Sequence, residues 1–329
     1  MNGSVFYLLS PLLLRKNECI NESIAVGRSY WDFVSISISY CFFCRFDEFS
    51  ENGGVIHSNS AGSNISISLS VFSRCRTLKY GGSIYVVFTG NGDFLISKNC
   101  VYNSSSFDYC HFAYIQTLQY RLIHLDYLSM TSSSQASKGT CANWFISGCQ
   151  KIENSNFSKN FADQSSAARF WTPQSSSVSY STFWKNSAKI TLYLCSGQGT
   201  IEYTNIVENQ SPSLGVIYAE SKPTYNFNYC VFHLNYKTLF CVATGTISIS
   251  HSFIDHSTYS TYSGPINTVL NNSNTLTNQY PFLFFGTYLC DAQNPIYIPP
   301  RALPTTHLYR FEQPRVDIFL CLSLLYIEG

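Results

Sequence analysis

Charged side chains are scarce in this chain. Asp, Glu, Lys and Arg make up 12% of its 329 residues, about half the usual share. The formal net charge is +1 and no run of Lys or Arg occurs. The electrostatic footprint of a nucleic-acid-binding protein is therefore missing, and we expect no nucleic-acid partner.

Long apolar runs are also missing. Val5–Leu14 and Ile318–Ile327 are apolar stretches of ten residues each, which is too short to span a bilayer. The first has no basic residue before it and no small-residue cleavage site after it, so it is a poor signal peptide. The second fits either a membrane anchor that is cut short or a closing strand, and both readings stay open.

The sequence lacks the common catalytic and metal-binding motifs. It contains no HExxH, no GxSxG and no P-loop. Its 13 cysteines are an odd number and include one CxxC, Cys41–Cys44, with no second pair at zinc-ribbon spacing. Several cysteines fall within the repeat described next and suit small core positions. We therefore predict no catalytic residue, no metal site and no cofactor.

A repeated pattern organises the middle of the chain. KIENSNFSKN (151–160), SVSYSTFWKN (177–186), TIEYTNIVEN (200–209) and NFNYCVFHLN (226–235) each place an apolar, a small and then a large apolar residue before a closing asparagine. Self-similarity at a period of 22 to 30 residues is the signature of a solenoid. The large apolar position recurs at Phe43, Phe72, Tyr102, Leu128, Phe157, Phe183, Ile206, Phe232 and Ile254.

The phase of the pattern predicts the geometry of one unit. The small residue lies two positions before the large one and shares its face of a strand. The apolar residue five positions before it is out of phase, so both point inward only if the chain turns a corner between them. That corner falls near Asn154, Tyr180, Tyr203 and Tyr229. The glycine pair in Gly81-Gly82-Ser-Ile, like the one in Gly53-Gly54-Val-Ile, predicts another corner.

Three short strands and three turns in each unit predict an all-β, single-stranded parallel β-helix (solenoid) of about nine coils. Stacked coils place like residues over one another, so the large apolar residues should fill the core and the amides should hydrogen-bond from coil to coil. The two expected columns are Phe157, Phe183 and Phe232, and Asn160, Asn186, Asn209 and Asn235.

The repeat also suggests the division of the chain. We expect an N-terminal lead segment at 1–28, the β-helix at 29–270 and a C-terminal cap and tail at 271–329. The cap is expected because an aromatic and proline-rich stretch follows the last repeat and would cover the open strand edge of the solenoid. The repeat weakens between about Phe107 and Ser147, where the polar stretch SMTSSSQASKGTC (129–141) predicts a loop that leaves the rod.

On these motifs the chain resembles polymorphic membrane proteins. Phe157–Asn160, Phe183–Asn186 and Phe232–Asn235 fit FxxN, and Gly53–Ile56 and Gly81–Ile84 fit GGxI, which is similar to the FxxN/GGAI repeats of that family. The resemblance covers about residues 30 to 290 and extends to right-handed β-helix proteins related in fold to pectin lyase, large sets of which occur in parasitic protists. It implies a right-handed coil and a surface or secreted adhesin or antigen.

Four aromatic residues are candidates for ligand binding. Tyr180, Tyr203 and Tyr229 fall on consecutive coils, and an exposed ladder would offer a platform for sugar rings; the alternative is a stacked corner that stiffens the rod. Trp184 points outward by alternation and would join a binding face or simply lie on the surface. Asp126 falls at a small-residue position of the repeat. Either it is a buried functional acid, or the coil is misaligned and Asp126 does not belong at that position; we favour misalignment.

Three functions fit the sequence. The leading prediction is a non-enzymatic β-helix, secreted or on the cell surface, for adhesion or carbohydrate recognition, with glycans or cell-surface proteins as partners. Seven N-x-S/T sequons, close to the number expected by chance, support it weakly. The first alternative is a polysaccharide lyase or hydrolase. Such an enzyme needs carboxylates that converge in one site, whereas the acidic residues of this sequence are dispersed. The second is an intracellular scaffold, which reduced cysteines and unmodified sequons would favour.

Overall fold

The computed structural model describes residues 52–61, 64–133 and 139–254, together with the strand residues 29–30, 35–39, 42–44, 47–48, 261–263 and 266–268. These residues form an all-β parallel solenoid of about eight turns, without a helix. The predicted parallel β-helix is confirmed, and its length is close to the nine coils expected. The predicted lead segment 1–28 and the predicted cap and tail 271–329 lie outside the described residues.

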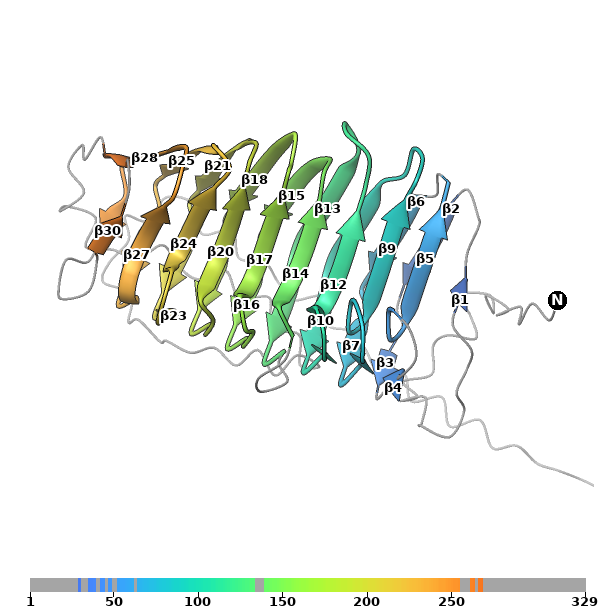
Figure 1. Cartoon of the computed structure of the whole chain (residues 1–329). Helices are drawn as coiled ribbons and strands as arrows, with labels where there is room; N and C mark the ends of the chain where they lie inside the picture. The colour runs from blue at the N-terminus through green and yellow to red at the C-terminus, as the bar shows by residue number, and fades with distance from the viewer. Residues whose placement is uncertain are drawn as a thin grey trace, which may run out of the picture. The chain divides into compact units, whose positions relative to one another are not determined.

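One strand of each turn joins a parallel sheet, here called sheet A, whose strands form the row of long arrows in Figure 1. Each strand pairs with the equivalent strand one turn away. In order along the solenoid the strands are β1 (Ser29–Tyr30), β5 (Ile56–Ser60), β9 (Ile84–Phe88), β12 (Cys110–Gln116), β14 (Cys141–Ile146), β17 (Ser165–Trp171), β20 (Ile190–Cys195), β24 (Gly215–Glu220), β27 (Tyr236–Val242) and β30 (Thr261–Ser263).

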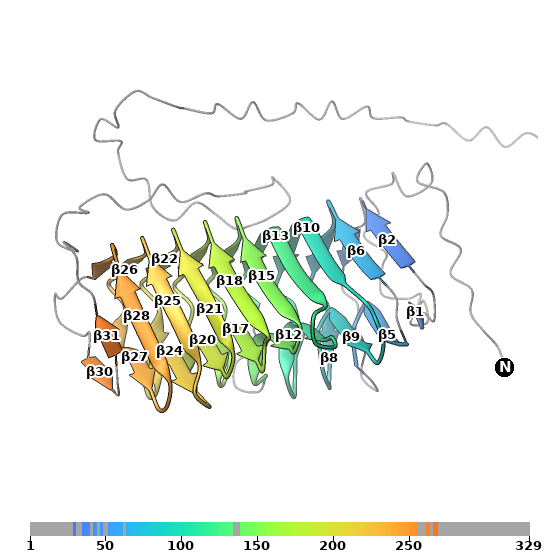
Figure 2. The ribbon, with the colours of Figure 1, turned by 90° about the horizontal axis from the view of Figure 1, so that it is seen from above.

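A second stack, sheet B, lies on another side of the turns and is seen in Figure 2. Its strands follow the same order along the solenoid, and each turn contributes one of them. They are β2 (Ser35–Ser39), β6 (Asn64–Ser68), β10 (Phe94–Tyr102), β13 (Leu122–Thr131), β15 (Cys149–Glu153), β18 (Ser175–Ser179), β21 (Gln198–Glu202), β25 (Thr224–Asn228), β28 (Thr246–Ser250) and β31 (Ile266–Thr268).

A third stack, sheet C, follows sheet B across a corner. The long strands β10 and β13 run across this corner and contribute their second halves to sheet C. The other members are β3 (Phe42–Cys44), β7 (Val71–Ser73), β16 (Asn156–Ser158), β19 (Thr182–Trp184), β22 (Asn205–Val207), β26 (Val231–His233) and β29 (Phe253–Ile254). Four two-residue strands complete the turns: β4 (Asp47–Glu48), β8 (Arg76–Thr77), β11 (Ser105–Ser106) and β23 (Gln210–Ser211).

The corner between sheets B and C is turned by one residue with a left-handed backbone in each coil, where the sequence predicted a bend. A positive φ is unfavourable for a residue with a side chain, and the paired strands on both sides hold it in place. The column consists of Leu69, Lys98, Tyr127, Asn154, Tyr180, Tyr203, Tyr229 and His251, with φ between 47° and 55°.

Glycine turns a second corner where side chains would collide. Gly81 has a φ of 65°, and a Cβ placed there would lie 2.0 Å from the carbonyl oxygen of Ile84. A Cβ on Gly82 would lie 2.0 Å from the carbonyl oxygen of His111 in the next coil. The GGxI motif thus marks a turn at which neighbouring coils approach too closely for any side chain.

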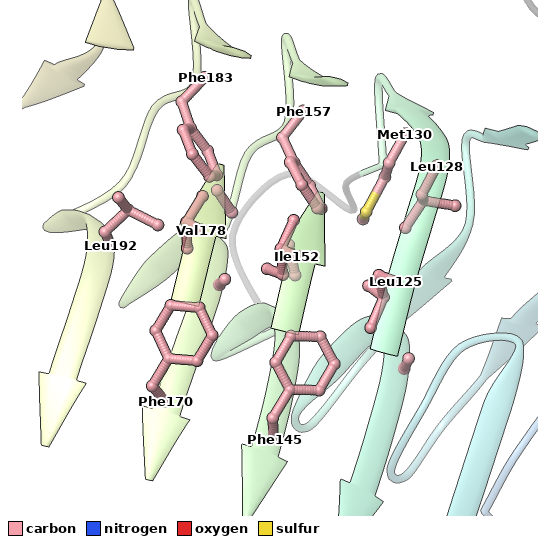
Figure 3. Close-up of a cluster of buried hydrophobic side chains, with 14 of the residues drawn as sticks. Leu125, Leu128, Met130, Phe145, Ile152, Phe157, Phe170, Val178, Phe183 and Leu192 are labelled. Carbon is pink, nitrogen blue, oxygen red and sulfur yellow. The ribbon is translucent and has the colours of Figure 1, made fainter. Parts of the chain in front are cut away.

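The core is a stack of equivalent apolar side chains. Phe157 and Phe183 pair in register on neighbouring strands, where Figure 3 labels both. Their ring centroids are 5.2 Å apart and their planes are 8° from parallel. The same column continues through Ile206, Phe232 and Ile254. Each of these five side chains is at most 2% exposed, so every coil buries its apolar surface mainly against the coils on either side.

Asparagine amides link the coils beside this core. The amide of Asn160 donates to Oδ1 of Asn186 at 3.1 Å, that of Asn186 to Asn209 at 3.0 Å, and that of Asn209 to Asn235 at 3.1 Å. Each Oδ1 also accepts the backbone N–H of the preceding asparagine, for example Asn160 N at 3.1 Å from Asn186. Side-chain amides therefore satisfy backbone donors that the corner would leave unpaired.

Two positions of the predicted core column are wrong by one or two residues. Val101, and not Tyr102, pairs with Phe72, and Met130, and not Leu128, pairs with Phe157. Both errors fall on β10 and β13, where Asn99 and Leu128 occupy the position, two residues before the large one, that is small in the other coils. The correct register pairs Asp126 with Glu153 on the outer face of sheet B, so the reading of Asp126 through a misaligned coil is confirmed.

The loop predicted at 129–141 is shorter than expected at both ends, and its residues 134–138 lie outside the described residues. The region 107–147, where the repeat weakens in the sequence, forms the regular strands β12, β13 and β14. Ser129, Met130 and Thr131 belong to β13, and Cys141 begins β14. Polar residues mislead here because serine and threonine fit a tightly stacked coil as well as a loop; Ser129 and Thr131 are both buried.

Candidate functional site

The outer side of sheet B carries a groove across five consecutive strands, β13, β15, β18, β21 and β25. We call this side the polar face. Alternation along each strand produces it: Val178, Ile201 and Phe227 point into the core, while their neighbours point out. The groove has a volume of about 490 Å³, and its outward lining includes Lys151, Ser177, Gln198, Thr200, Thr224 and Asn226.

The floor of the groove is held from inside the coil. The hydroxyl of the buried Tyr225 and the hydroxyl of Ser176 lie 2.6 Å apart, two coils away from each other. The Tyr225 ring packs against Gly199. A Cβ on Gly199 would lie 2.6 Å from this ring, so the contact has no room for a side chain there. Burial raises the pKa of the Tyr225 phenol well above its usual value, so the hydroxyl keeps its proton and the link is neutral.

Beside the groove, three titratable side chains come together on β13 and β15. Nε2 of His124 lies 3.1 Å from Oε2 of Glu153, and Asn154 donates to Oδ1 of Asp126 at 3.0 Å. One ligand atom of each of His124, Asp126 and Glu153 lies within 4.8 Å of the others, so among the described residues this trio could hold a metal ion. Imidazole and carboxylate ligands suit a divalent transition metal.

Lys151 changes the electrostatics of this trio. Its Nζ lies 2.7 Å from the same Oε2 of Glu153 that His124 approaches. Partial burial works to raise the pKa of Glu153, but the hydrogen bonds and positive charges of Lys151 and His124 outweigh it and lower that pKa below its usual value. Glu153 is thus ionised and already neutralised by a protein cation. Glu202, two coils further on, is bonded instead by Asn228.

The predicted tyrosine candidates form a stacked column at the corner between sheets B and C. Tyr203 lies 5.1 Å from Tyr180 and 5.0 Å from Tyr229, ring centroid to centroid, with planes within 3° of parallel. His251 continues the stack at 5.0 Å from Tyr229. Tyr180 and Tyr229 are 49% and 37% exposed. Because rings cover both faces of Tyr203, this residue has no free face for a sugar ring.

Trp184 does not lie on the surface as expected. Its side chain is only 3% exposed, although it points away from the core column formed by Phe183. The ammonium groups of Lys185 and Lys159 lie 4.6 Å and 5.2 Å from its ring. Both lysines occupy left-handed corner positions, and their side chains fold back over the indole. Alternation gave the correct direction, but neighbouring coils close over the ring.

The outer side of sheet A carries an aromatic stripe that the sequence analysis missed. Equivalent outward positions on six consecutive strands hold Tyr85, Tyr114, Trp144, Arg169, Tyr193 and Tyr218. Tyr85 and Tyr114 stack with centroids 5.2 Å apart. The sequence does contain a signal for this stripe. In three coils the isoleucine at the start of the apolar strand is followed by a ring-bearing residue, namely His57, Tyr85 and Tyr218.

Arg169 lies at the centre of this stripe. Its guanidinium is 4.4 Å from the rings of Trp144 and Trp171 and 4.5 Å from that of Tyr193. Arg169 and Tyr193 are 8% and 6% exposed. Burial lowers the pKa of the guanidinium from its usual value, yet that value is so high that the charge remains. The aromatic faces here are occupied by a cation from the chain itself.

Comparisons with protein-family models, curated proteins and solved structures found no match to this chain. The likeness to polymorphic membrane proteins and to pectin-lyase-like proteins therefore stays a prediction from the repeats. Within the part of the chain that the structure describes, no helix is both long and apolar enough to cross a membrane.

Proposed function

We propose that this protein is a non-enzymatic binding protein, secreted or displayed on the cell surface, that holds an extended neutral glycan along the polar face. The observation that carries this proposal is the groove of about 490 Å³ across five strands of sheet B. A groove that follows the stacking direction suits a chain-like ligand, because each coil adds an equivalent row of side chains about 4.8 Å further along.

The lining favours a carbohydrate over a charged or apolar ligand. Serine, threonine, asparagine and glutamine supply both donors and acceptors, as sugar hydroxyls require. Gln198, Thr200, Thr224 and Asn226 are exposed, so they meet a ligand without rearrangement of the core. Lys151 is the single charged residue in the groove lining, and Glu153 neutralises it. The resemblance to surface adhesins agrees with this proposal and supplies its expected location.

The test uses one substitution at two sites. Gln198 lies in the groove on β21, and Gln210 lies on β23 outside it; both side chains are exposed. Retention of the protein on a panel of immobilised neutral polysaccharides should fall at least tenfold for Gln198→Arg and stay within twofold for Gln210→Arg. Equal retention of both variants, or no retention of the wild type on any polysaccharide, would overturn the proposal.

The surface location needs its own test. Intact cells that produce the protein are treated with a protease that does not enter them, and the protein is followed with an antibody. Loss of the full-length chain from intact cells, or its recovery in the medium, is expected. A protein that is protected until the cells are lysed would support the alternative of an intracellular scaffold.

A polysaccharide lyase or hydrolase is the second candidate, because His124, Asp126 and Glu153 gather beside the groove. Catalysis would use one carboxyl as acid or base against a bond of the bound chain. The wild type and Glu153→Gln are incubated with the retained polysaccharide, and new reducing ends and unsaturated sugars are measured. Products that form with the wild type and not with Glu153→Gln would replace the binding function by an enzymatic one.

A further inference from the structure

Two cysteines of neighbouring coils face each other at the start of sheet A. Cys110 is the first residue of β12, Cys141 is the first residue of β14, and the two pair in register. Their Sγ atoms lie 2.8 Å apart, and neither side chain is exposed. This distance is shorter than the van der Waals contact of two sulfur atoms, so the coils press the two thiols together.

The backbone geometry suits a covalent link. Residues paired across neighbouring strands of a stack have Cα atoms about 4.8 Å apart, which lies within the range of about 4.4–6.8 Å found for disulfides. Elsewhere in the described strands the register sets cysteine against other residue types: Cys149 pairs with Leu122 and Ser175, and Cys241 pairs with Tyr218. The pairing of Cys110 with Cys141 is therefore specific to this one rung.

We propose that Cys110 and Cys141 form a disulfide that joins two successive coils of the solenoid. The oxidant is a low-molecular-weight disulfide such as oxidised glutathione. The thiolate of one cysteine attacks a glutathione sulfur and releases one glutathione thiolate. The second cysteine then attacks the mixed disulfide and releases the other. The two thiol protons pass through solvent to the two released glutathione thiolates, and the two electrons of the new bond reduce one glutathione disulfide to two glutathione molecules.

Burial decides when the bond forms. Burial, together with the adjacent Cys141, raises the pKa of the Cys110 thiol well above its usual value, and the thiolate is the reactive form. In the folded coil the thiols therefore react slowly. The bond forms while the coils are still assembling, and once formed it is shielded from reductants, since no solvent path reaches either sulfur.

The link would act as a staple in the middle of the solenoid. It closes a loop of one coil, from residue 110 to residue 141, and so restricts the unfolded chain. Solenoid coils are stabilised chiefly by their nearest neighbours, so a covalent bond between two coils opposes separation of the rod at that point. Oxidised protein should melt about 5 °C or more above the reduced form.

The test is peptide mapping of the full chain. The protein is refolded in a glutathione redox buffer, free thiols are blocked with N-ethylmaleimide in denaturant, and the digest is analysed by mass spectrometry. Mapping is needed in place of a thiol count because Cys100 is itself disulfide-bonded. A cross-linked peptide pair containing Cys110 and Cys141 is expected, and it should resist dithiothreitol until denaturant is added. Recovery of both residues as maleimide adducts overturns the proposal.

Two variants separate the bond from simple packing. In Cys141→Ser, Cys110 should become alkylated, and the difference in Tm between oxidising and reducing refolding buffers should shrink to the part that the Cys100 disulfide contributes. Cys230→Ser is the matched control, because Cys230 is fully buried but its sulfur donates to the carbonyl of Ile201, which a serine hydroxyl can also do. That control should keep the cross-link and the redox difference in Tm. A redox difference in Tm that is as large in Cys141→Ser as in the wild type would contradict the assignment.

Discussion

The ring of Tyr203 lies parallel to the ring of Tyr180, with 5.1 Å between their centroids and 3° between their planes. Tyr229 covers the opposite face of Tyr203 at 5.0 Å. The three rings thus stack on one another at the corner between sheets B and C. Their contact stiffens this corner and leaves Tyr203 only its ring edge and hydroxyl for a ligand.

Replacing the central tyrosine should therefore affect stability and leave glycan binding in the groove intact. In Tyr203→Leu we expect the Tm to fall by about 2–4 °C from the loss of two stacked contacts. Leucine is tolerated at this corner, since Leu69 occupies the same position with a φ of 49°. Retention on polysaccharide should stay within twofold. A variant that keeps its Tm and loses retention would show that the tyrosine ladder, and not the groove, binds the ligand.

The asparagine column should be the most sensitive polar feature of the fold. Asn186 accepts hydrogen bonds from the backbone and side chain of Asn160 and donates to the carbonyl of Phe157 and to Asn209. Asn186→Ala leaves these buried groups unpaired, so we expect a loss of about 3 kcal/mol in the free energy of unfolding. Urea denaturation measures it. The exposed Asn226→Ala should change it by less than about 0.5 kcal/mol, and equal losses would contradict a structural role for the column.

Trp184 should contribute to packing and not to ligand binding. Removing an aromatic side chain that is 3% exposed leaves a cavity, so Trp184→Ala should cost about 3–5 kcal/mol of unfolding free energy. Trp184→Phe should lose less, because it keeps a ring beneath Lys185 and Lys159. Both variants should retain polysaccharide as the wild type does at a temperature where they are folded. Iodide quenching of tryptophan fluorescence that is present in the folded wild type and lost in folded Trp184→Phe would contradict its burial.

His111 should make the stability depend on pH. Burial lowers its pKa to about 4 in the folded protein, whereas an unfolded histidine titrates near 6.5. Above pH 6.5 the imidazole is neutral in both states and has no effect. As the pH falls from 6.5 to 4, the unfolded state takes up a proton that the folded state does not, so stability falls by about 3 kcal/mol and then levels off.

A pair of histidine variants tests this assignment. His111→Asn keeps an acceptor for the Ser106 N–H that His111 Nδ1 now accepts at 3.2 Å. Its urea midpoint should change less between pH 6.5 and 4 than that of the wild type. His251→Asn alters an exposed histidine at a corner where Asn154 stands in another coil, and it should keep the wild-type pH dependence. The same slope in both variants would remove His111 as the cause.

The repeated motifs were sufficient for the fold because each reflects a local constraint that recurs in every coil. The large apolar residue of FxxN fills the core, its asparagine pairs with the next asparagine, and GGxI marks a corner without room for a Cβ. Where the constraint changed, the prediction failed. Asn99 and Leu128 stand on β10 and β13 where the other coils have a small residue, so Tyr102 and Leu128 were assigned in place of Val101 and Met130.

The surfaces were harder to predict because they depend on neighbouring coils. Trp184 was correctly directed outward, yet Lys159 from the neighbouring coil and Lys185 from its own coil cover it. Tyr180, Tyr203 and Tyr229 were assigned to consecutive coils, but their stacking, which removes the ring faces from solvent, follows from the spacing of the coils. The stripe through Tyr114 and Trp144 escaped notice because a bulge shifts the register between β12 and β14.

By itself the sequence determined the solenoid, its period, the inward and outward alternation of each strand and the identity of the asparagine column, since all of these repeat along the chain. Only the tertiary structure decided which outward side chains meet. The groove on the polar face, the trio of His124, Asp126 and Glu153, and the contact of Cys110 with Cys141 all join residues of different coils. Loop lengths vary from coil to coil, so sequence spacing does not fix that register, whereas hydrogen bonding between the parallel strands does.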